Sequence, residues 1–114
     1  HRRALILAST RLYRMIINIR IFTSMTKEVQ IKQLRSIPGV GKSIAIDLWN
    51  IDIRSIEDLK GKSPEKMFEQ SNKLAGKVQD RCLLYVFRCA VYYAETDENK
   101  YETEKLKWWN WKED

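Results

Sequence analysis

The sequence predicts an all-α fold, on three observations. No stretch shows the strict apolar–polar alternation that is typical of a half-buried β-strand. Apolar residues instead recur at helical spacing, in segments separated by proline, glycine and helix-capping residues. A length of 114 residues, with 44% hydrophobic and 32% charged residues, suits one compact domain with one modest core.

The first two expected helices flank a turn that contains a proline and two glycines. The first helix begins at Thr26, which can cap it, and ends by Ile37, because Pro38 disfavours helical geometry in the residue before it. The second helix covers residues 42–50, and Asn50 is expected to end it in a left-handed conformation.

The next two helices carry clear capping signals. Ser55 is expected to cap a short helix, with Asp58 three residues later as a variant of the capping box, and Gly61 ends it. The triplet Ser63-Pro64-Glu65 combines a capping hydroxyl, a proline at the first helical position and an acid in the first turn. We expect the helix that it starts to continue to about Leu74.

The last expected helix is the longest, and a tryptophan-rich tail follows it. This helix covers residues 78–94, is apolar nearly all round, and leads through an acidic loop to Trp108, Trp109 and Trp111. Tryptophans among lysines can stack on exposed nucleic-acid bases. In a domain this small, a terminal tryptophan cluster more often closes the core, so we expect the tail to pack over the last helix.

Charge is distributed unevenly and indicates a boundary near Met25. The formal net charge is +6. Residues 1–24 contain five arginines and no acid, which gives +5, whereas residues 25–114 contain 16 basic and 15 acidic residues, which gives +1. We therefore expect a basic leader (residues 1–24) and a domain (residues 25–114). The leader is interpreted as a stretch of upstream or foreign origin; a native extra helix and a basic arm for membrane or nucleic acid are the alternatives.

Composition disfavours several classes of chemistry. The only histidine is His1, which argues against histidine-dependent triads and histidine-rich zinc sites. Cys82 and Cys89 lie two helical turns apart, about 10.5 Å at the helical rise per residue, which exceeds disulfide reach. We expect both to be small buried apolar groups. Two cysteines and short apolar runs fit a reducing cytoplasm and predict no membrane span.

The most specific feature is the Pro-Gly-Val-Gly-Lys-Ser segment that joins the first two expected helices. Gly39 and Gly41 allow positive φ angles and close backbone approach, and Val40 can plug the turn between the helices. The turn would direct backbone N–H groups outward at the positive end of the second helix, which suits a phosphate. Lys42 adds a cation there, and Ser43 adds a hydroxyl.

The string LRSIPGVGKSIAIDL resembles the helix-hairpin-helix motif of DNA-binding proteins, whose hairpin holds backbone phosphates without reading bases. The resemblance implies a monovalent cation, potassium or sodium, at the hairpin carbonyls, and no other cofactor is expected. The string is not a Walker loop, because too few residues separate the glycine from the lysine and no strand precedes it. The alternative is that the hairpin only packs two helices or contacts a protein.

A second, degenerate hairpin is expected at residues 74–78, which gives a tandem helix-hairpin-helix domain with a tryptophan-rich tail. It retains only the first glycine, Gly76, so its backbone should bind a phosphate more weakly. Lys77, Arg81 and Arg88 would lie on one face of the last helix, where their charges could replace the missing amides. A solvated basic stripe is the alternative interpretation.

Four strings carry a wider resemblance: SIPGVGKSIAIDLWN, IRSIEDLKGKSPEKMFEQ, DRCLLYVFRCAVYYA and LKWWNWK. Through them, residues 34–114 resemble the pathogenicity-locus family of small bacterial helix-hairpin-helix proteins, often labelled as mitomycin resistance proteins. The competence-regulator C-terminal domain is more distantly similar in architecture. The resemblance leaves the leader outside the family. It implies a fold and no particular reaction, and no residue here predicts chemistry on a drug.

These observations predict a non-enzymatic cytoplasmic module that binds nucleic-acid backbone, DNA above all, weakly and without sequence specificity. The expected phosphate-binding residues are Gly39, Val40, Gly41, Lys42, Ser43, Lys77, Arg81 and Arg88. A protein-interaction module is the alternative, favoured by the near-neutral charge of residues 25–114, and a homodimer is left open. An enzyme ranks last, because no paired acids, nucleophile–base arrangement or ligand cluster stands out.

Overall fold

The computed structural model describes residues 27–112, and all of their regular structure is helical, as predicted. The elements in chain order are a helix at residues 27–34, α2 (Lys42–Asn50), η1 (Glu57–Leu59), α3 (Pro64–Ala75), α4 (Cys82–Glu95), η2 (Glu98–Lys100), η3 (Thr103–Leu106) and η4 (Trp108–Trp111), where η marks a 3-10 helix. The expected leader and the expected Thr26 cap lie outside the described residues.

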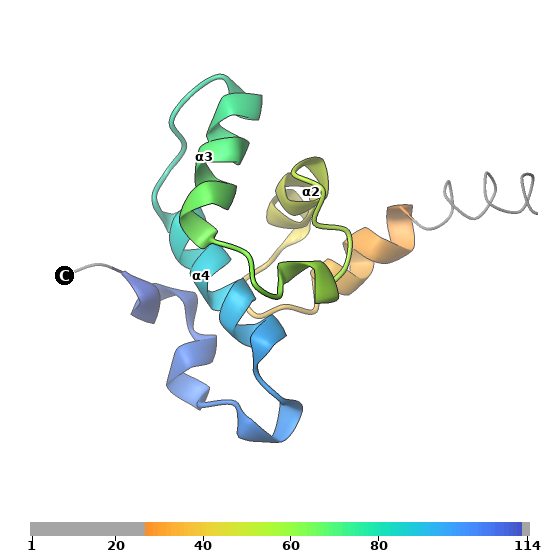
Figure 1. Cartoon of the computed structure of the whole chain (residues 1–114), viewed down its shortest axis with the longest axis vertical. Helices are drawn as coiled ribbons and strands as arrows, with labels where there is room; N and C mark the ends of the chain where they lie inside the picture. Colours follow the sequence, from red (N-terminus) through yellow and green to blue (C-terminus); the bar gives the residue numbers. More distant parts are fainter. Residues whose placement is uncertain (1–26, 113–114) are drawn as a thin grey trace, which may run out of the picture.

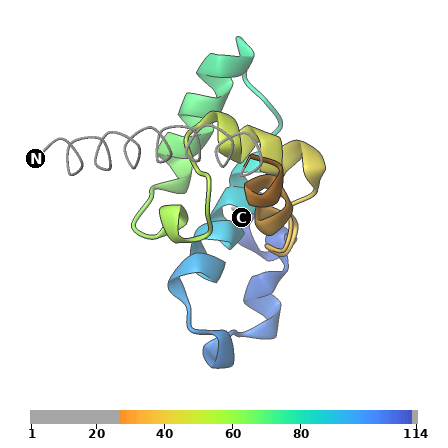
Figure 2. The same cartoon turned by 90° about the vertical axis from the view of Figure 1, so that its right-hand side faces the viewer.

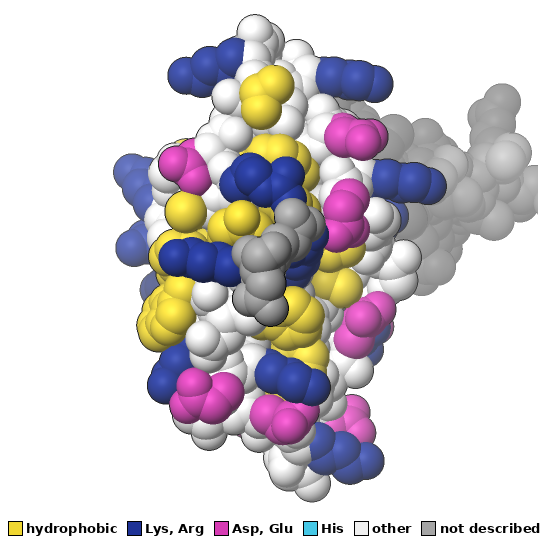
Figure 3. All heavy atoms as spheres, turned by 90° about the vertical axis from the view of Figure 1, so that its left-hand side faces the viewer, with side chains coloured by type: hydrophobic (Ala, Val, Ile, Leu, Met, Phe, Trp, Pro, Cys, Tyr) yellow, Lys and Arg dark blue, Asp and Glu magenta, His cyan; other side chains and the backbone are white. Residues whose placement is uncertain are grey.

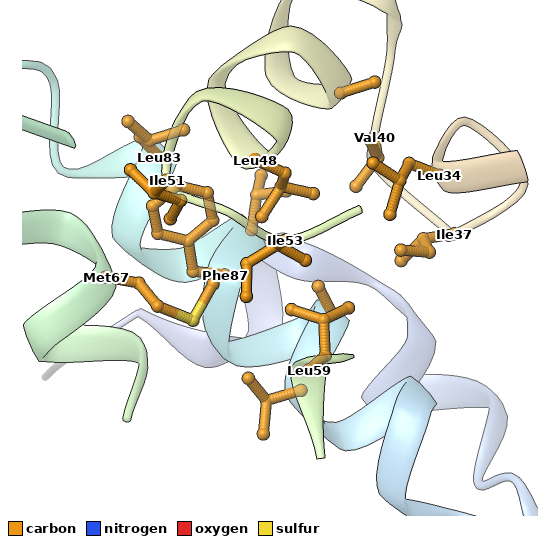
Figure 4. Close-up of a cluster of buried hydrophobic side chains, with 14 of the residues drawn as sticks. Leu34, Ile37, Val40, Leu48, Ile51, Ile53, Leu59, Met67, Leu83 and Phe87 are labelled. Carbon is orange, nitrogen blue, oxygen red and sulfur yellow. The ribbon is translucent and has the colours of Figure 1, made fainter. Parts of the chain in front are cut away.

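Helix α4 lies at the centre of the fold, and the other elements pack around it (Figure 1). Its Phe87 side chain is fully buried, with Leu48 of α2 and Met67 of α3 nearby (Figure 4). Leu34 and Val40 extend the same buried cluster toward the helix at residues 27–34. One continuous hydrophobic core therefore holds the described elements together, as expected for a domain of this length.

The capping signals of α3 are confirmed, and those of η1 are confirmed in part. The Ser63 hydroxyl accepts a hydrogen bond from the backbone N–H three residues later (3.3 Å), and Gly76 ends α3 in the left-handed conformation (φ 69°). Before η1, Ser55 accepts from the Asp58 backbone N–H (3.2 Å), while the Asp58 carboxylate accepts from the Arg54 backbone N–H (3.0 Å). The bond to Ser55 is the predicted one, but the N-cap residue of η1 is Ile56 and the carboxylate accepts from Arg54 and not from Ser55, so only part of the predicted capping box forms.

The expected role of Asn50 is wrong. Asn50 is the last residue of α2, and the left-handed residue is Asp52 (φ 66°). Ile51 and Ile53 on either side of Asp52 are both buried, and the Ile53 backbone N–H donates to the Leu48 carbonyl (2.9 Å). Because both isoleucines are buried, the left-handed residue lies two positions later than the preference of asparagine indicates.

The expected start of the last helix at residue 78 is also wrong, because α4 begins at Cys82. The Asn72 side-chain oxygen accepts from the Gln79 backbone N–H (2.9 Å), and the Asp80 carboxylate accepts from the Cys82 backbone N–H (2.8 Å). These side chains hydrogen-bond the backbone in a non-helical geometry, which competes with helix formation. The segment is therefore a turn stabilised by its own polar side chains.

The tail (residues 96–112) folds back along α4, as Figures 1 and 2 show. Trp108 is half-buried against the core, and the Trp111 indole N–H donates to the Lys105 carbonyl (2.9 Å). Tyr93 of α4 and Tyr101 of the tail stack with ring centroids 5.1 Å apart. The prediction that the tail packs over the last helix is confirmed. None of the helices in residues 27–112 is long and apolar enough to cross a membrane.

Candidate nucleic-acid interface

The first turn (residues 35–41) joins the helix at residues 27–34 to α2. Gly39 has a φ of 86°, in the left-handed region that favours glycine. Val40 is buried and its backbone N–H donates to the Ile37 carbonyl (3.0 Å), so its expected role as a plug is confirmed. The positive φ expected for Gly41 is wrong: its φ is −89°, an extended conformation open to any residue.

The N-terminus of α2 is open on its outer side. Gly41 is the N-cap residue and provides no side chain to accept from the first backbone N–H groups of the helix. A Cβ atom placed on Gly41 would meet no described atom within 4 Å. Lys42 and Ser43, which follow it, are exposed. The described chain thus leaves the approach to the positive end of the α2 dipole clear.

The inner side of the first turn rests on the tail and on α4. A Cβ atom on Gly39 would lie 2.9 Å from Cδ1 of Trp108, so only glycine lets the indole pack this closely. The Cys89 thiol of α4 lies 3.9 Å from the Pro38 carbonyl oxygen and 3.5 Å from that of Lys105. Burial raises the pKa of this thiol to about 11, so it stays protonated at neutral pH.

Three carbonyls of the first turn already have a partner within the described chain. The Ile37 carbonyl accepts the Val40 backbone N–H, and the Pro38 carbonyl faces the Cys89 thiol. The Gly41 carbonyl accepts from the Ala45 backbone N–H (2.9 Å) inside α2. Each carbonyl oxygen keeps a second lone pair, so the monovalent cation that the resemblance implies stays a prediction.

The second turn (residues 76–81) places the other expected phosphate ligands apart from one another. Lys77 lies in the turn before α4 and Arg81 is the N-cap residue of that helix, so the expected single helical face is wrong for Lys77. Arg88 is largely buried: its guanidinium pairs with Glu65 (3.2 Å) and donates to the Trp111 carbonyl (2.9 Å). Arg88 therefore anchors the tail to α3 and α4.

Polar side chains of the chain itself satisfy the backbone of the second turn. Besides the bonds of Asn72 and Asp80 already described, the Gln79 amide donates to the Ser71 hydroxyl (3.0 Å). Accepting the Cys82 backbone N–H lowers the pKa of Asp80, which keeps its carboxylate ionised. The second turn thus has acceptors of its own where a phosphate would otherwise bind.

A groove of about 430 Å³ separates the second turn from α2, and its charge is mixed. Asp47 of α2 and Asp80 line it together with Lys77, beside the apolar Ile44 and Leu83. Burial raises the pKa of Asp47. Two acids against one lysine make this groove a poor receptor for an anion.

A second groove, about 370 Å³ in volume, lies between the helix at residues 27–34 and α2, next to the first turn. We call it the basic groove; its lining residues are Glu28, Ile31, Lys32, Arg35, Lys42 and Ile46. Sequence reasoning found Lys42 but missed Lys32 and Arg35. Lys32 lies on the helix at residues 27–34 and Arg35 follows its last residue, and their three-residue spacing is the signal that could have found them.

The two cysteines differ in their surroundings. Neither forms a disulfide. Cys89 is fully buried, as expected, whereas the expected burial of Cys82 is wrong, because this residue is only half-buried beside Asp80. The hydrogen bond to Asp80 raises the pKa of the Cys82 thiol. Within residues 27–112, no group of three or more His, Cys, Asp or Glu side chains is placed to hold a metal ion.

A family model described as pathogenicity locus (Cdd1) matches residues 27–114, so the chain belongs to this family. The match begins upstream of Leu34, where the resemblance in the sequence became recognisable, and it includes the helix that forms one wall of the basic groove. Comparisons with curated proteins and with solved structures found no match.

Proposed function

We propose that this member of the pathogenicity-locus family is a non-enzymatic cytoplasmic module that binds the phosphate backbone of nucleic acid. The first turn makes the contact, in the manner of a helix-hairpin-helix motif, and binding is independent of base sequence. The backbone N–H groups at the start of α2 donate to a phosphate oxygen, and Lys42 adds a positive charge beside them.

The observation that carries this proposal is the environment of Gly41. Its φ of −89° does not require glycine, and no described atom would collide with a side chain there. The fold would accept serine or aspartate at this N-cap position, where both are favoured over glycine. A glycine that the fold does not need leaves the amides of α2 open to an acceptor from outside.

The charges around the two turns support a site at the first turn. Lys42 shares the basic groove with Lys32 and Arg35, whereas Lys77 shares its groove with two acids. Arg81 at the start of α4 remains a supporting contact in this proposal. Arg88 contributes by holding the tail, whose Trp108 supports the first turn.

Substitution of Gly41 tests the proposal directly. In Gly41→Ser the hydroxyl should cap α2 and raise the free energy of unfolding by a few tenths of a kcal/mol, while it competes with phosphate for the same amides. Gly41→Asp should act in the same way and also repel the ligand. We expect affinity for a duplex and for a single-stranded oligonucleotide, measured by fluorescence anisotropy at two salt concentrations, to fall as stability rises.

Lys42→Glu should weaken binding to every nucleic-acid sequence about equally. The slope of log affinity against log salt concentration should decrease by the amount expected for about one or two phosphate contacts. The matched control is Lys73→Glu, which makes the same charge change on an exposed residue at the far end of α3. All variants are made in the full chain, so the five arginines of residues 1–24 contribute equally to each. Unchanged affinity in both Gly41 variants and in Lys42→Glu would contradict the proposal.

The second turn supports a protein-interaction module as the second candidate. Leu74 and Val78 flank Gly76 and are 63% and 82% exposed. Two apolar side chains held outward on a turn that has its own acceptors are suited to an apolar partner, including a second copy of this chain. Light scattering after size-exclusion chromatography tests whether the partner is a second copy of this chain. A dimer in the native sequence, and a monomer in the double variant Leu74→Ser with Val78→Ser, would favour self-association.

A further inference from the structure

The basic groove carries charge that the rest of the described chain does not neutralise. In the tail, Lys100, Lys105 and Lys107 each pair with an acid three residues earlier, at 3.7, 2.7 and 3.0 Å. Around the basic groove, Lys32, Arg35 and Lys42 are exposed and form no ion pair among residues 27–112. Glu28 is the only acid of the lining. The near-neutral domain therefore has a local excess of positive charge here.

The floor of the same groove is apolar. Ile31 of the first helix is half-buried against the core, and Ile46 of α2 is 37% exposed. Ile46 lies one helical turn after Lys42, on the same face of α2. Figure 2 shows the helix at residues 27–34 (orange) beside α2 (yellow). The groove thus has two isoleucines at its base and basic side chains at its edges. These surroundings suit a ligand that has a flat uncharged group between two anionic groups.

We infer that the basic groove binds one nucleoside of a single-stranded nucleic acid, next to the phosphate held by the first turn. The base lies on Ile31 and Ile46, and the phosphate on its other side contacts Arg35 and Lys32. This inference rests on the proposed function, and it adds a specificity for strand type that the first turn alone would not provide.

The dimensions and position of the groove favour a single strand over a duplex. A volume of about 370 Å³ is large enough for a nucleobase with its sugar. In a duplex the bases are stacked and paired, so they cannot enter a cleft between two protein helices, whereas bases of a single strand can be turned outward. Phosphates of either form can reach the first turn, because its Lys42 rim is exposed.

Three probes separate base contacts from phosphate contacts. We would measure the affinity of the full chain for a short oligothymidylate, for an abasic strand of the same length, and for a duplex of the same length. Burying one face of a thymine on aliphatic side chains should make the oligothymidylate bind about tenfold more tightly than the abasic strand, at roughly 25 cal/mol per Å² of apolar surface.

Variants of the groove should affect the single strands more than the duplex. Ile46→Ser should remove most of this preference for oligothymidylate and leave affinity for the abasic strand and the duplex unchanged. Val29→Ser is the matched control: Val29 is 52% exposed on the helix that forms the other wall, but it does not line the groove. Arg35→Gln should weaken both single strands more than it weakens the duplex, because the duplex loses only the general attraction of one charge.

The outcomes distinguish the inference from the function on which it rests. Equal affinity for oligothymidylate and the abasic strand, with loss of both in Gly41→Asp, would overturn the nucleoside site and leave the phosphate site standing. No binding of any probe, or no effect of Gly41→Asp, would overturn both. Displacement of every probe by polyglutamate at equal charge concentration would show a general site for acidic chains and would also overturn the inference.

Discussion

The two turns that precede α2 and α4 connect helices in similar ways but satisfy their backbones differently. The first turn is built from glycine and a buried valine, and no side chain caps the helix after it. In the second turn the side chains of Asn72 and Asp80 accept from backbone N–H groups, and the Gln79 amide donates to the Asn72 side chain. A helix start needs acceptors from somewhere. In the second turn the side chains of the protein supply these acceptors. In the first turn the acceptors must come from solvent or from a ligand.

The comparison extends to what lies behind each turn. Gly39 of the first turn touches Trp108 of the tail, while Gly76 of the second turn would have no atom within 4 Å of an added Cβ. The open turn is thus the one that the tail supports from inside. Rigid support behind an unsatisfied backbone is the arrangement expected of a binding turn.

Removing the Trp108 side chain, which supports the first turn, should have the largest effect on the free energy of unfolding. We expect Trp108→Ala to lower the free energy of unfolding by about 2 to 3 kcal/mol, below the usual cost for a fully buried tryptophan because Trp108 is half-buried. Urea denaturation measures the change. Amide chemical shifts should move in the first turn and not in the second. Trp109→Ala is the control, since Trp109 is 50% exposed; equal losses in the two variants would contradict a specific support.

The second largest difference is expected when a methyl group is added to one glycine of each turn, because the two variants should lose different amounts of stability. Gly39→Ala meets both a φ of 86° and the Trp108 side chain, so we expect it to cost about 2 kcal/mol or more. Gly76→Ala meets only a φ of 69°, for which about 1 kcal/mol is expected. Both are measured by urea denaturation. The comparison fails if Gly76→Ala proves the more damaging of the two.

Alkaline pH should also lower the free energy of unfolding, through the thiol beside the first turn. The pKa of Cys89 is about 11 in the folded chain against an ordinary value of 9.0, so the unfolded thiol ionises first. Its contribution to stability is complete below pH 9 and is lost as the pH rises toward 11. Between pH 8 and pH 10.5, the free energy of unfolding should therefore fall more steeply in the native sequence than in Cys89→Ala.

Cys82→Ala is the matched variant for this experiment. Cys82 is only half-buried and lies beside the second turn, so its loss should flatten the pH dependence less than the loss of Cys89. If the two variants flatten it equally, the burial of Cys89 behind the first turn has no separate thermodynamic effect.

Local signals in the sequence predicted the elements that local chemistry determines. Helix α2 has the predicted bounds, and Ser63, Pro64 and Gly76 delimit α3 nearly as expected, because capping hydroxyls, proline and left-handed glycine act within a few residues. The buried Val40 followed in the same way from its place between two glycines. These signals, together with the lack of apolar–polar alternation in the sequence, were enough to predict the all-α class.

Contacts between distant segments decided what the sequence could not predict. The late start of α4 depends on Asn72, seven residues before Gln79, and the position of the left-handed Asp52 depends on burial of its two neighbours. The basic groove needs two helices to lie side by side, so the spacing of Lys32 and Arg35 places them near each other but does not indicate that Lys42 joins them. The partners of Arg88, Glu65 and the Trp111 carbonyl, each lie 23 residues away, which no helical spacing indicates.

The ion pairs of the tail have a consequence for how the molecule meets a polyanion in solution. Three lysines of the tail, Lys100, Lys105 and Lys107, are matched locally by acids, so they exert less long-range attraction than the three basic residues of the basic groove, which form no ion pair among residues 27–112. Figure 3 shows basic and acidic side chains next to one another at the lower end of the molecule, which the tail forms. Within a Debye length of about 8 to 10 Å, the domain should therefore be turned by the approaching phosphates so that the groove arrives first, an orientation set during diffusion, before any contact forms.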